Sequence, residues 1–257
     1  MNKFFHIIIG LLCSIAVNAE CTMSGLSIFP NSSSISKNQI FVIEGYALSQ
    51  KTVLGLNDKY SIYLKSGNKQ IKLIVTELCI GQFNLTQAIL KPERILELSE
   101  SYTLHIDSLP KFERLHRINT LTKKYEPISF TVKNDVDTQN PRLNGNPFEI
   151  KKIFAQYGCG PSMHVVFSNP AKDQSPLLVK TTVKNLLTGH TVMYYLIPQD
   201  DQIKVGHDMC SGAFDYDESE YYEVSFTFMD SSGNSIKWNG PSIRFSKPTI
   251  TNSQKEE

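Results

Sequence analysis

Two short stretches of the sequence place a cysteine close to a histidine, a combination that can bind zinc. Cys159 and His164 lie in CGPSMH, and His207 and Cys210 lie in GHDMC. Thiolate and imidazole groups at such close spacings can complete a tetrahedral zinc site. The spacing of these four residues is not one of the usual zinc motifs. Disulfide formation is the competing interpretation, and it is favoured if the chain is exported.

A second candidate metal site is the stretch FMDSSGNSIKW at residues 228–238. Asp230, Ser232 and Asn234 alternate as oxygen ligands of calcium could, but an EF-hand loop needs further carboxylates. Gly233 and Asn234 tolerate positive φ, as a tight hairpin turn requires. We therefore predict that this stretch turns the chain and holds no metal.

Acidic side chains gather in DYDESE (215–220) and QDDQ (199–202). Paired carboxylates can cleave glycosidic bonds, but both clusters lie where turns are expected, and solvated turns explain them better. The sequence contains no nucleophile elbow, zinc-protease, phosphate-binding or dinucleotide-binding motif. We therefore predict a protein that is not an enzyme and that needs no cofactor.

The most distinctive segment is a long basic loop at residues 108–127. Phe112, Leu115 and Ile118 recur at every third residue, which indicates a short amphipathic helix. Long loops on rigid scaffolds often bind partners, so one hypothesis is contact with an anionic partner or glycan. The interpretation that we favour is a solvated loop whose apolar stripe caps an open sheet edge. The candidate partner-binding residues are Lys111, Arg114, His116, Arg117, Lys123 and Lys124.

The N-terminal sequence MNKFFHIIIGLLCSIAVNA predicts a cleaved signal peptide over residues 1–19. It has a basic residue, an apolar run and small residues before the cleavage site. The run is shorter than a transmembrane anchor needs. Without Lys3, 25 basic and 25 acidic residues remain, which argues against nucleic-acid binding. We expect an exported protein that is periplasmic or secreted and has no transmembrane anchor.

Four cysteines remain in the predicted mature chain: Cys21, Cys79, Cys159 and Cys210. Export to an oxidising compartment makes disulfides the default. The simplest of the three pairings is sequential, Cys21–Cys79 and Cys159–Cys210. Each such bond closes a loop of about 50 residues and would stabilise the fold by about 4 kcal/mol.

Strand signals dominate the rest of the chain. Short alternating or β-branched runs are separated by turn signals such as SGNK, LTGH and SSGN, a pattern typical of antiparallel sandwiches. In YYEVSFTFM, residues 222, 224, 226 and 228 are expected to face the core. A polar stretch predicts a linker at 133–145, between domains at 20–132 and 146–248, with a polar tail at 249–257.

Both halves place a tyrosine at the start of a strand, after a polar turn, in LKPERILELSESYTLHI and in EYYEVSFTFMDSSGNSIKW. These stretches resemble bacterial immunoglobulin-like domains of exported or cell-envelope proteins. The resemblance implies an all-β fold of two tandem immunoglobulin-like antiparallel β-sandwich domains, in which the corner tyrosine bonds back to the backbone. It implies a location in the envelope and no single activity.

These features favour a non-enzymatic exported binding, adhesion or envelope structural module, with an extracellular or envelope protein or glycan as partner. The alternative is an enzyme or accessory subunit that acts on envelope polymers or glycans, with acidic turns or the cysteine–histidine set as its site.

Overall fold

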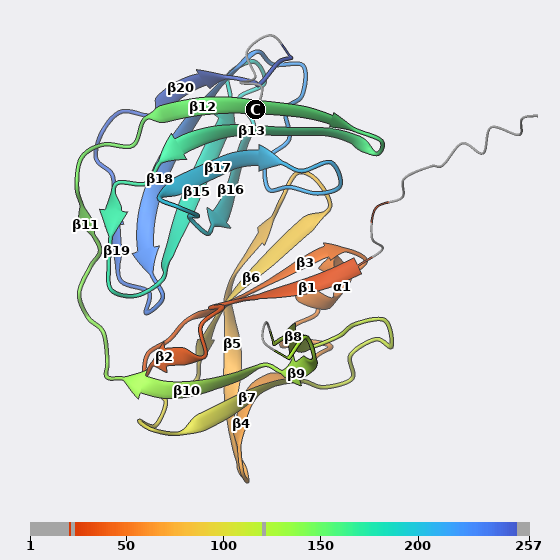
Figure 1. The fold of residues 1–257 in the computed structure, drawn as a ribbon, viewed down its shortest axis with the longest axis vertical. Helices are drawn as coiled ribbons and strands as arrows, with labels where there is room; N and C mark the ends of the chain where they lie inside the picture. The colour runs from red at the N-terminus through yellow and green to blue at the C-terminus, as the bar shows by residue number, and fades with distance from the viewer. Residues whose placement is uncertain (1–20, 22–23, 120–121, 251–257) are drawn as a thin grey trace, which may run out of the picture.

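The computed structural model describes Cys21, residues 24–119 and residues 122–250. The predicted signal peptide and residues 251–257 of the predicted tail lie outside this part. Within it, strands are separated by turns and by one short helix, so the all-β prediction is confirmed. Figure 1 shows two sheet-rich bodies, one built from each half of the chain.

The first half forms one curled eight-stranded sheet, with the order β1-β3-β6-β5-β4-β7-β10-β2. All neighbours are antiparallel except β10 and β2, which run parallel. The start of β5 pairs with β4 and the rest pairs with β6, so this long strand joins two facing parts of the sheet. The strands are β1 (Ser24–Phe29), β2 (Ser34–Ser36), β3 (Phe41–Ala47), β4 (Ile62–Ser66), β5 (Lys69–Ile80), β6 (Leu85–Pro92), β7 (Ser101–Ile106) and β10 (Ser129–Asn134).

Helix α1 (Gln50–Leu54) packs against β3 and β6 and buries Thr52 and Val53. It can approach β3 closely because Gly45 has no side chain. A Cβ at Gly45 would lie 2.4 Å from the carbonyl oxygen of Ser49. A small hairpin follows later in the chain, formed by β8 (His116–Ile118) and β9 (Tyr125–Pro127).

The second half contains a three-stranded sheet, β12-β13-β17, and a five-stranded sheet, β16-β15-β18-β19, in which β20 also pairs with β18. A separate two-stranded ladder pairs β11, which comes before β12, with β14, which follows β13. The strands are β11 (Arg142–Leu143), β12 (Glu149–Tyr157), β13 (Gly160–Ser168), β14 (Ala171–Lys172), β15 (Leu177–Asn185), β16 (Thr191–Leu196), β17 (Gln202–His207), β18 (Tyr221–Asp230), β19 (Ser235–Lys237) and β20 (Ile243–Ser246).

Side-chain alternation follows the sequence prediction most clearly in β18. Tyr222, Val224, Phe226 and Phe228 are all buried, while the residues between them are more exposed. A strand with one apolar face can stand at the surface of a two-layer body, because its other face tolerates water. The expected core face of this strand is therefore confirmed.

The tyrosine predicted at the corner of the first half is also confirmed. Tyr102 is fully buried, and its hydroxyl oxygen accepts a hydrogen bond of 3.3 Å from the backbone N–H of Glu97. In the second half, the Tyr222 hydroxyl donates to a side chain instead, the Asp217 carboxylate, at 2.8 Å. Both tyrosines fix the turn before their strand.

The two halves share an apolar core. The cluster centred on the second half also takes in buried residues of the first half, namely Phe29, Ile40, Val42, Cys79 and Ile89. Polar contacts surround this junction. The Gln87 side chain donates to the Tyr195 carbonyl at 3.0 Å and accepts from the Tyr195 N–H at 3.1 Å.

The predicted disulfide pairing is wrong. The disulfide joins Cys21 to Cys210, across 189 residues. Cys79 is buried in the junction instead, 3.9 Å from the sulfur of Met193. Strand β5 carries Cys79 onto the face that packs against the second half. Backbone bonds between Phe83 and Gly212 bring the segment containing Cys210 to the first half. One pair per half therefore does not form, because the start of the first half meets the segment between β17 and β18 of the second half.

Candidate functional site

The basic segment at 108–127 is a loop followed by the β8–β9 hairpin, so the expected amphipathic helix is wrong. Leu115 packs against the core of the first half, whereas Phe112 and Ile118 are exposed. The apolar residues at every third position do not share a face, because the chain is extended where Ile118 lies. The sequence interpretation is that these three apolar residues cover the body. Of the three, only Leu115 does so.

Two polar anchors hold this segment on the body. The Glu113 carboxylate is buried and accepts hydrogen bonds from the Ser49 and Thr52 hydroxyls, at 2.9 and 2.7 Å. Ser49 precedes α1 but does not cap it with its side chain, and bonds Glu113 instead. The Arg117 guanidinium donates to the carbonyl of Pro30 at 3.0 Å and lies 5.8 Å from the centre of the Phe130 ring.

The six candidate residues of this segment divide into two groups. Arg117 faces the body, and burial lowers its pKa below the usual value for arginine. The other five residues are exposed: Lys111, Arg114, His116, Lys123 and Lys124. Five of the six candidate side chains are therefore exposed on one projecting segment. The sixth, Arg117, has a structural role.

The loop at 230–234 turns the chain between β18 and β19, as predicted. Asp230 is fully buried, and its carboxylate accepts hydrogen bonds from the Ser232 N–H at 2.8 Å and the Asn234 N–H at 2.9 Å. The Asn234 side-chain amide donates to the second carboxylate oxygen at 2.7 Å. Gly233 has the positive φ, +91°, that the turn needs. Burial raises the pKa of Asp230 above its usual value.

In the folded protein, two further carboxylates lie close to Asp230, a proximity that the sequence did not predict. One oxygen from each of Asp137, Asp173 and Asp230 lies within 4.8 Å of the others. Oxygen atoms of this kind suit calcium, but they already accept hydrogen bonds. The Ser175 hydroxyl donates to Asp137 at 3.0 Å, and its N–H donates to Asp173 at 2.8 Å. The carboxylates therefore act here as acceptors that order neighbouring loops.

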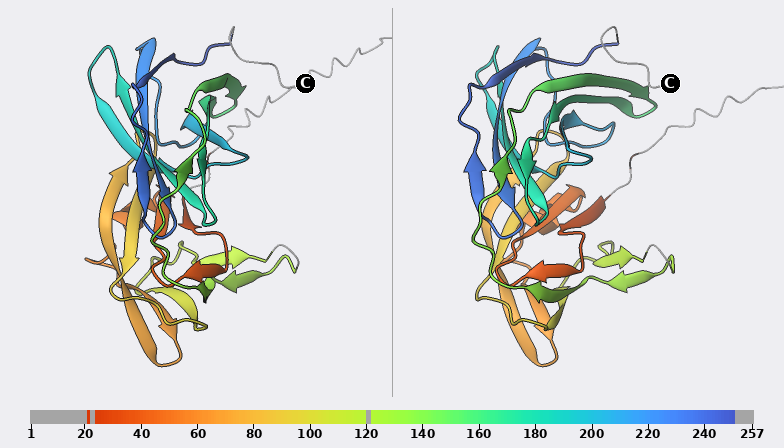
Figure 2. Two further views of the ribbon diagram at one scale, coloured as in Figure 1. Left: turned by 90° about the vertical axis from the view of Figure 1, so that its left-hand side faces the viewer. Right: turned by 60° about the vertical axis from the view of Figure 1, so that its left-hand side comes forward.

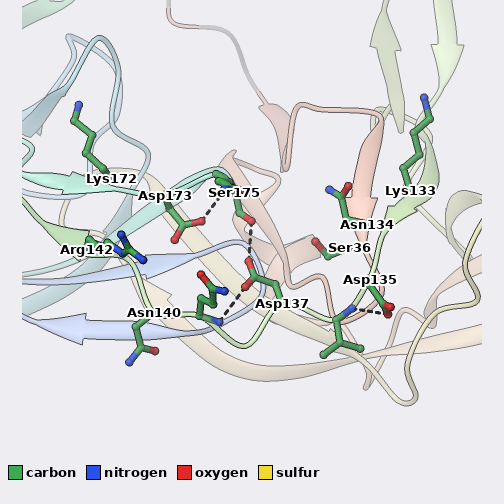
Figure 3. A pocket seen from close by; sticks show the side chains of 13 residues that line it. Ser36, Lys133, Asn134, Asp135, Asp137, Asn140, Arg142, Lys172, Asp173 and Ser175 are labelled. Carbon is green, nitrogen blue, oxygen red and sulfur yellow. Dashed lines mark hydrogen bonds between the residues drawn. The ribbon is translucent and has the colours of Figure 1, made fainter.

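A polar hollow of about 850 Å³ opens beside these aspartates, between the predicted linker and the 172–175 loop. Figure 3 shows Asp137 bonded to Ser175, with Arg142 and Lys172 on one side of the hollow and Lys133 on the other. The linker is bonded to both halves here, because the Asp137 carbonyl accepts from the side-chain amides of Asn38 and Asn234 at 2.7 and 3.0 Å. The hollow is thus a junction between the halves.

The cysteine–histidine set does not converge on one point. The Sγ atoms of Cys21, Cys159 and Cys210 lie within 4.8 Å of one another, and this cluster contains no histidine among the described residues. His207 is buried, and its Nδ1 lies 2.9 Å from the carbonyl oxygen of Asp208. Because Cys210 is bonded to Cys21, its sulfur is not a thiolate ligand here. Burial raises the pKa of the Cys79 thiol to about 12, so it stays protonated at neutral pH.

The acidic cluster at 215–220 has a structural role at Asp217. This carboxylate accepts from the Asn185 amide at 2.7 Å, the Ser219 N–H at 2.8 Å and the Tyr222 hydroxyl. These donors hold the pKa of Asp217 below its usual value, with the Ser219 N–H as the main cause. In the other cluster, Asp200 and Asp201 lie in a turn with positive φ.

None of the helices that the structure describes is long and apolar enough to cross a membrane. No family model matches the sequence, and no curated protein was found to match it.

Three solved structures resemble this fold at low TM-scores. A pullulanase of Anoxybacillus sp. LM18-11 complexed with maltotriose is 9% identical, with a TM-score of 0.24 over 77% of this chain and 24% of that chain. The N-terminal part of the bacterial S-layer protein SbsC is 12% identical, with a TM-score of 0.27 over 88% and 44%. The calcium-binding domain CBD12 of CALX1.1 is 8% identical, with a TM-score of 0.21 over 80% of each chain.

This chain spans about a quarter of the length of the pullulanase. At these TM-scores the similarities assign neither a family nor a function to the protein.

Proposed function

We propose that the protein is a non-enzymatic binding module that is exported to a bacterial cell envelope, in the periplasm or outside the cell. The observation that carries this proposal is the Cys21–Cys210 disulfide, which ties the start of the first half to the second half. Disulfides of this structural kind persist in oxidising compartments and are rare in the cytosol. The signal-like N-terminal sequence supports the same location.

An immunoglobulin-like arrangement of both halves belongs to this proposal. In the first half, β1-β3-β6-β5 and β4-β7-β10-β2 correspond to the two layers of such a sandwich, and Tyr102 occupies the corner position. In the second half, a three-stranded and a five-stranded layer enclose the core. Domains of this architecture serve many binding roles, so the fold alone names no ligand.

The junction between the halves favours a rigid module over a hinged one. The shared apolar core is flanked by the paired bonds of Gln87 with Tyr195, and by the Tyr195 hydroxyl, which donates to Glu77 at 2.7 Å. Lys180 of the second half pairs with Glu77 at 2.8 Å. A body held at this many points presents its surface loops in fixed relative positions.

Fractionation of a bacterial host with a periplasm tests the location. After expression of the full-length sequence, the protein should be recovered from the periplasm, the envelope or the medium, and its N-terminus should be shortened. Peptide mapping should find Cys21 bonded to Cys210. Recovery of an unprocessed, reduced protein from the cytoplasm would overturn the proposal.

Incubation with isolated envelope polymers tests the absence of catalysis. The purified protein should sediment with its ligand without releasing soluble fragments, as measured by mass spectrometry of the supernatant. Sustained release of glycan fragments that scales with protein concentration would show an enzyme instead.

A further inference from the structure

The β8–β9 hairpin has one face toward the body and one face that is exposed. The register pairs Ile118 with Tyr125 and Arg117 with Glu126. Residues directly opposite each other share a face, and successive residues alternate. Because Arg117 reaches the body through Pro30 and Phe130, Ile118 and Tyr125 lie on the opposite side. We call the set His116, Ile118, Tyr125 and Pro127 the outward face.

Apolar surface is exposed on and beside the outward face. The exposed fractions are 52% for Ile118, 61% for Tyr125 and 49% for Phe112, which precedes the hairpin. Single exposed apolar residues need no explanation, but a cross-strand pair on a projecting element is a site where burial would gain free energy. Both views of Figure 2 show this hairpin projecting from the body.

Exposed cations lie near this apolar pair in space or next to it in sequence. The Arg114 guanidinium lies 6.0 Å from the centre of the Tyr125 ring. Lys123 and Lys124 lie in the turn immediately before Tyr125, and Lys111 precedes Phe112. The segment is therefore locally positive, although the whole sequence has a formal net charge of only +1. A local excess of positive charge attracts anionic surfaces.

The two acidic groups of the segment do not cancel this charge on the outward face. The Glu113 carboxylate is buried against Ser49 and Thr52. Glu126 shares the face of Arg117, and it accepts a hydrogen bond of 2.9 Å from the Asn119 side chain. The outward face therefore combines exposed apolar side chains with a cationic border.

This combination fits the surface of an anionic phospholipid bilayer better than an acidic glycan. Aromatic and aliphatic side chains beside lysine and arginine are the residues that insert at the headgroup level, where the apolar parts leave water and the cations meet lipid phosphates. An acidic polysaccharide would pair with the cations but would leave Ile118 exposed.

We propose that the outward face of the β8–β9 hairpin, with Arg114, Lys123 and Lys124, docks the protein onto an anionic phospholipid surface. The inference rests on the proposed role as an envelope binding module, for which it supplies the partner. Glu113 and Arg117 hold the hairpin in its projecting position, so the face is prepared for contact without refolding of the body.

Co-sedimentation of the purified mature protein with vesicles tests the proposal. Vesicles of phosphatidylglycerol mixed with phosphatidylethanolamine should bind the protein, and vesicles of phosphatidylcholine should bind it much more weakly. Added salt should release it, since the attraction between exposed charges is screened. Equal binding to both kinds of vesicle, or no binding to either, would overturn the proposal.

Substitutions locate the binding face. Lys123→Gln with Lys124→Gln should lower the partition coefficient about 25-fold, because each cation near an anionic surface contributes about a fivefold factor. Ile118→Ser with Tyr125→Ser should lower it at least about tenfold. Matched controls are Lys184→Gln with Lys237→Gln, and Tyr157→Ser, which change exposed residues of the second half and should bind as the parent does. Thermal melting of each variant checks that it is folded.

The outcomes separate this inference from the proposed function. Retention on acidic polysaccharide beads that depends on the hairpin, without vesicle binding, would replace the lipid surface with a glycan and overturn the proposal. Binding that survives all hairpin substitutions would also overturn it. Neither result affects the compartment of the protein, which fractionation and disulfide mapping measure independently.

Discussion

Burial and nearby hydrogen-bond donors shift the pKa values of individual carboxylates in this protein. Asp230 and Glu44 both have raised pKa values, and in each case burial is the main cause. Asp230 is nevertheless held by three donors of its own turn. Glu44 lies at the junction of the halves, where its carboxylate accepts a hydrogen bond of 2.9 Å from the Tyr194 hydroxyl.

Asp230→Ala should lower the free energy of unfolding by about 1–3 kcal/mol, because it leaves buried donors of the turn without an acceptor. Urea denaturation monitored by fluorescence measures the change. Asp58→Ala, which removes an exposed carboxylate from another turn, is the control and should have almost no effect. If both variants unfold at the same urea concentration, the turn does not depend on Asp230.

Glu44→Gln should reduce the pH dependence of stability. Because the pKa of Glu44 is raised in the folded protein, the folded state binds more protons than the unfolded state at pH values just above 4.5. The free energy of unfolding therefore falls as pH rises through this window. Glutamine removes this contribution while keeping an acceptor for Tyr194.

The measurement is urea unfolding of parent and variant at a series of pH values, with the difference between them plotted against pH. Glu220→Gln, which changes an exposed carboxylate, is the control. A constant difference between parent and Glu44→Gln across the series would contradict the expected linkage.

At the scale of elements, the loop and hairpin at 108–127 depend on a few anchors. Helix α1 supplies Thr52, the residue before it supplies Ser49, and both hydroxyls donate to Glu113. Leu115 and Arg117 add an apolar and a cationic contact with the same body. The element is therefore positioned by side chains far apart in sequence, since its own backbone ladder covers only three residue pairs.

Glu113→Ala should loosen this segment. The loss of a buried acceptor should cost about 1–3 kcal/mol of stability, and trypsin should cleave at Lys111 and Arg114 faster than in the parent. The cleavage sites are identified by mass spectrometry after brief digestion. Glu126→Ala changes an exposed carboxylate of the same segment and should be cleaved at nearly the parental rate. Equal cleavage of all three proteins would show that Glu113 is not an anchor.

For the whole molecule, the disulfide and the junction decide how the halves are joined. The Cys21–Cys210 bond closes a loop of nearly the full described chain. Cross-links over long loops restrict the unfolded ensemble most. The bond thus adds to the apolar contacts that already join the halves.

Cys210→Ser should lower the free energy of unfolding by up to about 5 kcal/mol, and a reducing agent should destabilise the parent by a similar amount. Cys79→Ala is the control, because its buried thiol is not part of the bond and the variant should remain sensitive to reductant. Denaturation with and without reductant measures both effects. Peptide mapping that finds Cys21–Cys79 and Cys159–Cys210 would contradict the observed pairing.

Local sequence determined those features that depend on neighbours along the chain. The alternation in 221–229 predicts the buried face of β18, the polar turn before Tyr102 predicts a corner, and Gly233 predicts the turn after Asp230. Each requires only the backbone geometry of one strand or one turn. A large share of the all-β fold follows from these signals, because strand faces and turns repeat along the whole chain.

Only the tertiary structure decided which distant segments meet. Cys21 and Cys210 are separated by 189 residues, and residue types alone do not distinguish this pair from the sequential pairing. The same holds for Asp137, Asp173 and Asp230, and for the hairpin whose three-residue period suggested a helix. Long-range neighbours depend on how whole sheets pack, and this packing is set by the sum of many contacts rather than by any short motif.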